Sequence, residues 1–302
     1  MIVIGNFDGV HPGHRQCLRA AKAMAPGAPL IVLTFWPHPV AVLNPAKGPM
    51  LLTSLDERVA LLREAGADEV LVIEFTREFA SWSPSDFVER TLVPLHPRLV
   101  VVGENFRFGH RAAGTVDSLR DLAGGRFDVR ALSLVRFGDE ETSSSRIRAA
   151  LVEGDVRHAA EHLGRPFRFC GEVVHGDERG RDLGFPTANL PVPELQACPA
   201  DGIYAGWVTR LDGRDEFDYP LPTGEPFPRW PAAISVGSNP TFDGDSRRVE
   251  SYVLDRDDLE LYGARIAVDF VERIRGQIKF SGVGGLIEQM RDDVAKVRQV
   301  LR

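Results

Sequence analysis

The sequence predicts an α/β protein of two domains: a doubly wound parallel-sheet domain over residues 1–164, then a small antiparallel β-barrel with a C-terminal helix over residues 165–302. Three observations predict this arrangement. The chain of 302 residues is longer than a single hydrophobic core usually supports. Its first half alternates short apolar runs with helical patterns, which is typical of a parallel sheet. Its second half has apolar runs separated by turn residues, which is typical of an antiparallel barrel.

The strands expected in the first half are apolar runs rich in Val, Ile and Leu, as in strands buried on both faces. They cover residues 2–4, 30–35, 70–75 and 99–102. A capping-box pattern at Ser54 predicts a helix to about residue 65. Ser83 before Pro84 predicts another helix that ends near residue 92. Residues 156–163 read as the last helix of this half.

The strands expected in the second half cover residues 167–174, 204–211, 232–236, 250–254 and 266–271. Residues 211–230 carry four prolines and further turn formers, which predicts a long surface loop. A helical pattern returns over residues 286–301. Glycines at 282, 284 and 285 predict that the start of this helix frays.

Composition excludes several classes of function. The net charge of −7 argues against a nucleic-acid partner, because phosphate backbones demand a basic face. No apolar run is long enough to span a membrane, and no signal peptide is recognisable. The three cysteines are far apart and form no Cys-x-x-Cys pair, which predicts a reducing, cytoplasmic location. We therefore expect small-molecule partners; a homo-oligomer is left open.

The sharpest motif follows the first expected strand and opens a helix. It reads Gly-Asn-Phe-Asp-Gly-Val-His-Pro-Gly-His over residues 5–14. Glycines allow a tight turn and a close approach of backbone to a ligand, and a helix N-terminus favours an anion. His11 and His14 are three residues apart, so both can lie on one face of the first helical turn. Two imidazoles there can donate to phosphate oxygens.

This motif resembles the HxGH nucleotidylyltransferase superfamily, and its longer form is similar to the bacterial FAD synthetase branch. Residues 143–148, Ser-Ser-Ser-Arg-Ile-Arg, resemble that family's phosphate-binding motif, with serine at 145 where the family usually has threonine. The resemblance implies a Rossmann-like domain that transfers AMP from ATP to FMN, with His11 and His14 at the reacting phosphates. The implied ATP and phosphate contacts in this half are Gly5, Phe7, Asp8, Gly9, Gly13, His38, Ser144, Ser145, Arg146 and Arg148.

Two shorter segments agree with that resemblance. His38 lies in Phe-Trp-Pro-His-Pro after the second expected strand, where the family usually has Phe-x-Pro-His-Pro. Asn105 and Phe106 follow the fourth expected strand in a loop that resembles the family's flavin-side loop. Ligands of open α/β sheets bind at the carboxyl ends of strands, which is where both segments lie.

The second half carries a different phosphate motif. No lysine follows a glycine anywhere in the chain, so there is no Gly-Lys-Ser/Thr P-loop. Residues 180–189 instead read Gly-Arg-Asp-Leu-Gly-Phe-Pro-Thr-Ala-Asn. Gly180 and Gly184 give a loop that can bring backbone N–H groups to phosphates. Thr187 and Asn189 offer two neutral oxygens on one face of an extended chain, which suits Mg²⁺ beside ATP.

This motif, with Pro186 before Thr187, closely resembles the Gly-Phe-Pro-Thr-Ala-Asn motif of riboflavin kinases. Segments at 202–206, 235–242 and 248–255 are similar to further parts of that family's barrel. The resemblance implies that Glu250 is the base that takes a proton from the terminal ribityl hydroxyl. Together the two halves imply a bifunctional enzyme that uses ATP and Mg²⁺ to convert riboflavin to FMN, and FMN to FAD.

Alternative interpretations remain. A different HxGH transferase, such as one acting on pantetheine phosphate, leaves the second half unexplained. A riboflavin kinase with an impaired adenylyltransferase domain is a second alternative, because family members usually have more residues before the first strand; a weakened sheet would reduce adenylylation more than phosphorylation. The third is a non-catalytic flavin-binding regulator, which has no need for His11, His14, Thr187, Asn189 and Glu250 together.

Overall fold

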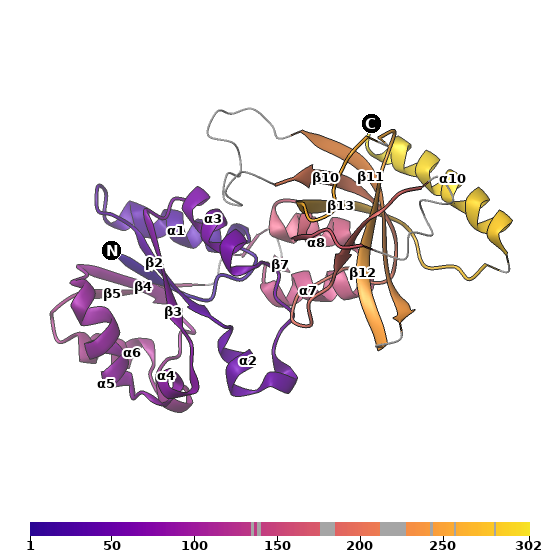
Figure 1. The fold of residues 1–302 in the computed structure, drawn as a ribbon. Helices are drawn as coiled ribbons and strands as arrows, with labels where there is room; N and C mark the ends of the chain where they lie inside the picture. The colour runs from indigo at the N-terminus through magenta and orange to yellow at the C-terminus, as the bar shows by residue number, and fades with distance from the viewer. Residues whose placement is uncertain are drawn as a thin grey trace. The chain divides into compact units, whose positions relative to one another are not determined.

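The computed structural model describes residues 1–133, 136–137, 140–175, 185–211, 228–241, 244–256, 258–280 and 282–302. The chain forms two compact units, Met1–Ser143 and Ser144–Arg302 (Figure 1). Gly180, Gly184 and Phe242 lie outside the described residues, as do residues 212–227 of the loop expected over 211–230.

The first unit is built on a five-stranded parallel sheet in the order β3-β2-β1-β4-β5. Its strands are β1 (Ile2–Ile4), β2 (Ile31–Trp36), β3 (Glu69–Glu74), β4 (Leu99–Gly103) and β5 (Asp128–Leu132). Its helices are α1 (Pro12–Met24), α2 (Pro39–Leu43), α3 (Leu55–Glu64), α4 (Arg77–Ser81), α5 (Pro84–Phe87) and α6 (Val116–Ala123). A short antiparallel pair, β6 (Arg136–Phe137) and β7 (Glu140–Glu141), follows. The doubly wound α/β prediction for this half is confirmed.

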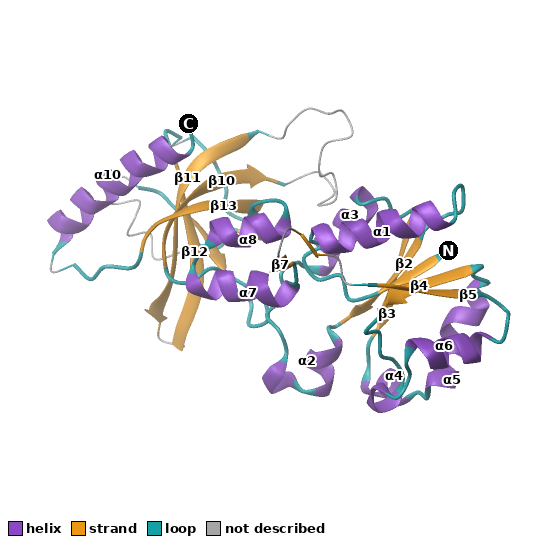
Figure 2. Cartoon of the chain, turned by 180° about the vertical axis from the view of Figure 1, so that it is seen from behind, coloured by secondary structure: helices purple, strands orange, loops and turns teal. Residues whose placement is uncertain are grey.

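Helices cover both faces of this sheet (Figure 2). On one face, Leu18 of α1 and Leu61 of α3 are buried against Val3, Val32 and Val101. On the other face, buried side chains of α5 and α6 pack against the alternate residues of the same strands. Because apolar side chains leave both faces of each central strand, these strands read as unbroken hydrophobic runs in the sequence.

Helix caps explain where two of the predicted helices begin. The Ser54 hydroxyl accepts from the Glu57 N–H, 3.1 Å away, and α3 starts at the next residue. Ser83 and Asp86 form a reciprocal capping box at the start of α5. The helix after Ser83 continues beyond α5 as a π turn over Val88–Leu92 (η2), so its predicted end near residue 92 is confirmed. Pro94 follows in a 3-10 turn, Val93–Leu95 (η3).

The second unit is a six-stranded antiparallel sheet in the order β8-β13-β10-β11-β12-β9. The strands are β8 (Phe167–Glu172), β9 (Ala188–Pro191), β10 (Gly202–Arg210), β11 (Arg229–Thr241), β12 (Gly244–Val253) and β13 (Arg265–Arg275). The two edge strands approach each other, and the Val174 N–H donates to the Asn189 carbonyl at 2.9 Å. This bridge brings the sheet close to a closed barrel, as predicted.

Helices flank the barrel. α7 (Ser144–Glu153) packs on α8 (Val156–Leu163), and α8 packs on β8 and β13. α10 (Val283–Val300) lies along β10, β11 and β13 (Figure 1). The Arg275 guanidinium binds the Asp293 carboxylate of α10 at 2.6 Å, and both side chains are largely buried. A buried ion pair of this kind fixes the helix against the sheet, because either charge alone would be costly to bury.

Some predicted boundaries differ from the structure. The predicted loop over 211–230 is wrong at its end, because Arg229 and Trp230 belong to β11. β9 was not predicted, since it is short and has no alternating pattern. α10 begins three residues before the predicted start, at Val283. The first compact unit ends at Ser143, so α7 and α8 belong to the unit of the barrel; the functional boundary at residue 164 stays a prediction.

Candidate active sites

The loop between β1 and α1 lies at the point where the order of the parallel sheet reverses. β1 pairs with β2 on one side and with β4 on the other. Neighbouring strands are about 4.8 Å apart, so the segments that leave their carboxyl ends are close together. Ligands of doubly wound sheets bind at this reversal. The predicted residues that follow β1, β2 and β4 therefore share one edge of the first unit.

His11 and His14 form a stacked pair at the start of α1. Their ring centroids are 3.6 Å apart and the ring planes differ by 21°. His11 is the N-cap residue of α1, and its ring lies over Gly13, where a Cβ atom would come within 3.1 Å of the imidazole. The sequence prediction that both histidines share one face is confirmed. Gly13 is required for a close approach of the His11 side chain.

The loop before His11 has an unusual backbone. Phe7, Gly9 and Val10 have φ values of 54°, 87° and 39°, in the left-handed region. For a non-glycine residue this region costs roughly 1–3 kcal/mol, and for a β-branched residue such as Val10 it is rare. The conformation places the Phe7 ring edge-on to His14, with centroids 5.2 Å apart, and against Gly5. Other parts of the first unit must therefore hold the loop in place.

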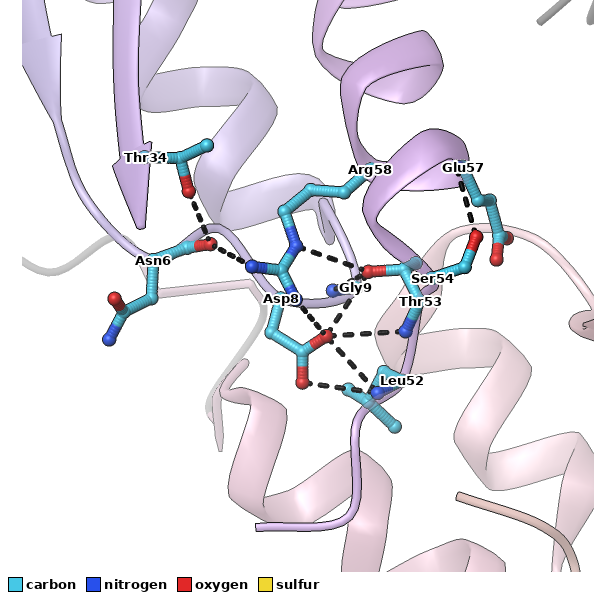
Figure 3. A network of polar contacts seen from close by, with 9 residues as sticks. All are labelled: Asn6, Asp8, Gly9, Thr34, Leu52, Thr53, Ser54, Glu57 and Arg58. Carbon is cyan, nitrogen blue, oxygen red and sulfur yellow. Dashed lines mark hydrogen bonds and ion pairs between the residues drawn. The ribbon is translucent and has the colours of Figure 1, made fainter. Parts of the chain in front are cut away.

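A buried network supplies that restraint (Figure 3). The Asp8 carboxylate is 2% exposed and accepts from the Leu52 and Thr53 N–H groups and the Thr53 hydroxyl. The Arg58 guanidinium, fully buried, donates to Asp8 and to the Asn6 carbonyl oxygen, both at 3.1 Å. Thr53 in turn accepts from the Gly9 N–H. These contacts join the loop to α3 and to the segment before it.

Sequence reasoning did not identify Arg58, Thr53 or Thr34, whose hydroxyl also donates to the Asn6 carbonyl. Arg58 stands in an amphipathic helix, where an arginine is usually exposed. Nothing in the local pattern distinguishes it from such a residue. The prediction that Asp8 contacts ATP phosphates stays a prediction; the observed partners of its carboxylate favour a role in holding the loop.

The environment of His14 disfavours the imidazolium form. Burial lowers the pKa of His14 well below its usual range, and the positive charges of His11 and Arg58 lower it further. The Nδ1 atom of His14 is buried without a hydrogen-bond partner. His14 is therefore neutral at pH 7 and has one N–H to donate.

This shift makes a prediction for stability. A histidine whose pKa is lowered by folding takes up its proton in the unfolded state first, so stability decreases as the pH falls below the ordinary value of about 6.5. We expect the free energy of unfolding to fall by at most about 1.4 kcal/mol for each pH unit between roughly 6.5 and 5. Urea denaturation of the wild type and of His14→Gln across this range measures the effect. Equal slopes in the two proteins would contradict it.

The other predicted residues of the first unit lie at the ends of β2 and β4. His38 caps α2, and its Nδ1 accepts from the Val40 N–H at 3.2 Å. Asn105 is exposed, and its side chain folds back so that the Oδ1 atom covers Gly103. Phe106 stacks on Phe108 with centroids 5.4 Å apart. These positions flank the β1–α1 loop, as expected from the strand order.

Ser144, Ser145, Arg146 and Arg148 lie on the first turns of α7, in the second compact unit. Ser145 and Arg146 are exposed, and Ile147 between the arginines is buried. The four serine and arginine residues thus lie at a helix start. Their participation in a site with His11 and His14 stays a prediction.

The barrel brings its predicted residues together across adjacent strands. Glu250 of β12 lies directly opposite Asn189 of β9 on one side and Ser235 of β11 on the other. Residues opposite each other in an antiparallel sheet point to the same face, with Cβ atoms about 5 Å apart. Ser235 also accepts from Gln277 at 3.4 Å. Asn189, Glu250 and Ser235 therefore form one polar row, which we call the Glu250 row.

Thr187 lies two residues before Asn189. The Asn189 amide donates to the Thr187 carbonyl at 3.1 Å and approaches the Thr187 hydroxyl at 3.5 Å. The side-chain oxygens of both residues are neutral, hard metal ligands. Among the described residues, no group of three His, Cys, Asp or Glu side chains forms a metal site. Mg²⁺ usually takes few protein ligands and keeps phosphates and water as the others, so Thr187 and Asn189 fit a nucleotide-bound Mg²⁺.

The face of the barrel that carries Glu250 is the one covered by α10. Tyr252, two residues along β12, lies with Leu254 against Val294 and Val297 of α10. Phe185 packs edge-on against Tyr252, with ring centroids 5.1 Å apart. The Glu250 row is thus next to an aromatic patch beneath the helix, whereas Val249 and Ser251 point into the barrel core.

Known families match both halves of the chain. The FAD synthetase family matches residues 1–146, and the riboflavin kinase family matches residues 163–301. The bifunctional riboflavin kinase/FMN adenylyltransferase of Listeria monocytogenes is 36% identical, over 99% of this chain and 91% of its own. The protein of the same name from Escherichia coli K12 is 34% identical, over 99% and 92%. This chain belongs to the bifunctional riboflavin kinase/FMN adenylyltransferase family. The family resemblance inferred from the motifs is therefore confirmed.

A solved structure from Streptococcus pneumoniae has the same fold as this family member. It is named a macrolide-efflux protein, is 31% identical, and superposes with a TM-score of 0.83 over 98% of this chain and 93% of that one. Among the described residues of the present chain, no helix has both the length and the apolar character needed to cross a membrane.

Proposed function

We propose that this chain phosphorylates riboflavin to FMN and then transfers AMP from ATP to FMN, which yields FAD and pyrophosphate. Membership of the bifunctional family supports both reactions. The observation that carries the proposal is the placement of the two sets of chemistry-bearing residues. His11 and His14 stack in the half that matches FAD synthetases, and Glu250 faces Asn189 in the half that matches riboflavin kinases.

In the kinase reaction, the Glu250 carboxylate accepts the proton of the terminal ribityl hydroxyl. The oxygen then attacks the γ-phosphorus of ATP, the bond to the β-phosphate oxygen breaks, and ADP leaves. A positioned general base of this kind contributes about 10²- to 10⁴-fold to a rate. The carboxylate is partly exposed on β12, so a substrate hydroxyl can reach it.

Thr187 and Asn189 would hold Mg²⁺ bound to the ATP phosphates. The ion supplies neutralisation of the phosphate charge and orientation of the transferred group. Asn189 lies opposite Glu250 and donates to the Thr187 carbonyl, which supports a position for the ATP phosphates near the proposed base. Gly180, Gly184 and Pro186 are proposed to line the same nucleotide.

In the adenylyl transfer, a phosphate oxygen of FMN attacks the α-phosphorus of ATP, and the bond to the β-phosphate oxygen breaks. The attacking group is already an anion at pH 7, so positioning and charge stabilisation carry the rate. The imidazoles of His11 and His14 donate N–H groups to the reacting phosphate. The site is shaped by Gly5, Phe7, Asp8, Gly9, Gly13 and His38. The leaving pyrophosphate is held by Ser144, Ser145, Arg146 and Arg148. The flavin contacts Asn105 and Phe106.

The cytoplasmic location stays a prediction from the cysteine pattern. The lack of a nucleic-acid partner stays a prediction from the net charge, and the lack of a membrane partner stays a prediction from the absence of a long apolar run. The sequence also leaves a homo-oligomer open.

Isotopically labelled ATP tests the two reactions in one experiment. With riboflavin as substrate, phosphorus label in the γ-position of ATP should appear first in FMN and then in FAD. Label in the α-position should appear in FAD and never in FMN. With FMN as substrate, only the α-label should enter flavin. Entry of α-label into FMN, or no label in any flavin from a folded sample, would refute the proposal.

A further inference from the structure

The β1–α1 loop has a backbone conformation that its own residue types do not favour. Phe7 and Val10 hold backbone conformations that non-glycine residues avoid, yet the stacked imidazoles depend on them. A loop with this backbone relaxes unless its surroundings over-determine it. The contacts that keep the loop in this conformation therefore also set the position of His11 and His14.

Arg58 makes several of the contacts that restrain the loop. Its guanidinium reaches three acceptors in different directions: the Asn6 carbonyl at 3.1 Å, Asp8 at 3.1 Å, and the Thr53 hydroxyl at 3.4 Å (Figure 3). Its face lies over the Trp36 ring, 5.4 Å from the centroid. A rigid planar fork can hold three acceptors at once, whereas a lysine ammonium is a single point charge on a flexible stem.

The charge of Arg58 also acts on the reacting side chains. The charges that lower the pKa of His14 are those of His11 at the start of α1 and Arg58 on α3, and Asp8 is paired with Arg58. The positive charge of Arg58 opposes protonation of His14. Arg58 thus acts on the HxGH pair twice, through the backbone of the loop and through its field.

A simple stabilising role does not account for this arrangement. Burial of an Arg–Asp pair is expensive, and apolar residues of similar size often stabilise a fold as well or better. What apolar residues cannot do is bind the Asn6 carbonyl and the Asp8 carboxylate in fixed positions. The pair is explained by the geometry that it imposes on the loop.

We propose that Arg58 is a positioning residue for adenylyl transfer, which holds the Asn6–Val10 loop so that His11 and His14 meet the reacting phosphate. The proposal rests on the proposed function of the first unit. A misplacement of about 1 Å at a reacting group can cost on the order of a hundredfold in rate. Loss of the guanidinium fork is therefore expected to reduce FAD formation strongly, while FMN formation in the barrel is unaffected.

Three variants of the full chain test the proposal. Arg58→Lys keeps the charge and a partner for Asp8 but removes the fork. Arg58→Met removes both. Arg63→Met places the same substitution at an exposed position of the same helix and is the matched control. FMN formation from riboflavin and FAD formation from FMN are measured separately, and each rate is divided by the folded fraction from a melting curve.

We expect Arg58→Lys to form FAD at least about tenfold more slowly per folded molecule, with FMN formation within about twofold of the wild type. Arg63→Met should match the wild type in both. The histidine NMR titration gives a second readout that loss of stability alone does not change: the His14 resonance should titrate at higher pH in Arg58→Met and stay near the wild-type position in Arg58→Lys.

The proposal is overturned if Arg58→Lys forms FAD at the wild-type rate per folded molecule. It is also overturned if the His14 titration in a folded Arg58→Met protein is unchanged. Arg58→Lys retains a buried charge pair, so the test does not depend on whether Arg58→Met folds. If the wild type itself makes no FAD from FMN, the proposed function fails, and this outcome is distinct from any result with the variants.

Discussion

Glu250→Ala is expected to abolish FMN formation from riboflavin and to leave FAD formation from FMN within about twofold of the wild type. We propose this carboxylate as the general base of the kinase reaction, and its loss should reduce the kinase rate by about 10²- to 10⁴-fold. His11 and His14, the residues proposed to contact the reacting phosphates in the adenylyl transfer, lie in the other compact unit, whose core does not include β12. Separate assays from riboflavin and from FMN, with chromatographic detection of the flavins, measure both rates.

Glu172→Ala is the matched control, because it removes an exposed glutamate from β8 of the same barrel. It should leave both rates unchanged. If Glu250→Ala slows both reactions equally in a folded protein, the assignment of Glu250 to a separate kinase site is wrong.

His14→Ala is expected to have the opposite effect. Removal of one donor to charge that develops in a transition state costs about 10²- to 10³-fold, and the stacking partner of His11 is lost as well. FAD formation from FMN should fall by at least this factor, whereas FMN formation from riboflavin should be retained. The two half-reactions are measured as for Glu250→Ala.

His96→Asn is a suitable control for the loss of a histidine from the first unit. His96 is exposed and has a φ of 45°, which asparagine tolerates. We expect wild-type rates in both reactions. Retention of FAD formation by His14→Ala would show that the HxGH motif does not serve this chemistry.

The helices and strands were predictable where their burial produces a clear pattern of apolar residues in the sequence. β2 and β4 are buried on both faces, and the amphipathic helices begin at recognisable caps. Weaker patterns were not recognised. β5 has polar residues at Asp128 and Arg130, as an edge strand allows, and β9 has only four residues. Such strands are defined by their pairing partners, which are distant in the sequence.

The candidate sites show the same division. The contiguous motifs of the sequence predict His11, His14 and Glu250 as site residues, and the structure stacks the first two rings and places Glu250 opposite Asn189. Arg58 was not predictable from its helix. Its partners, Asn6 and Asp8, are about fifty residues away, so only the packing of α3 on the sheet reveals it.

A time course with the purified wild-type protein tests the central claim, that one chain carries out both steps. The reaction contains riboflavin, ATP and Mg²⁺, and a parallel reaction starts from FMN. We predict that FMN appears first and is converted to FAD in the former, and that FAD forms without a lag in the latter. FMN with no FAD in either reaction would contradict the adenylyltransferase assignment, and the absence of both products from a folded sample would contradict the account as a whole.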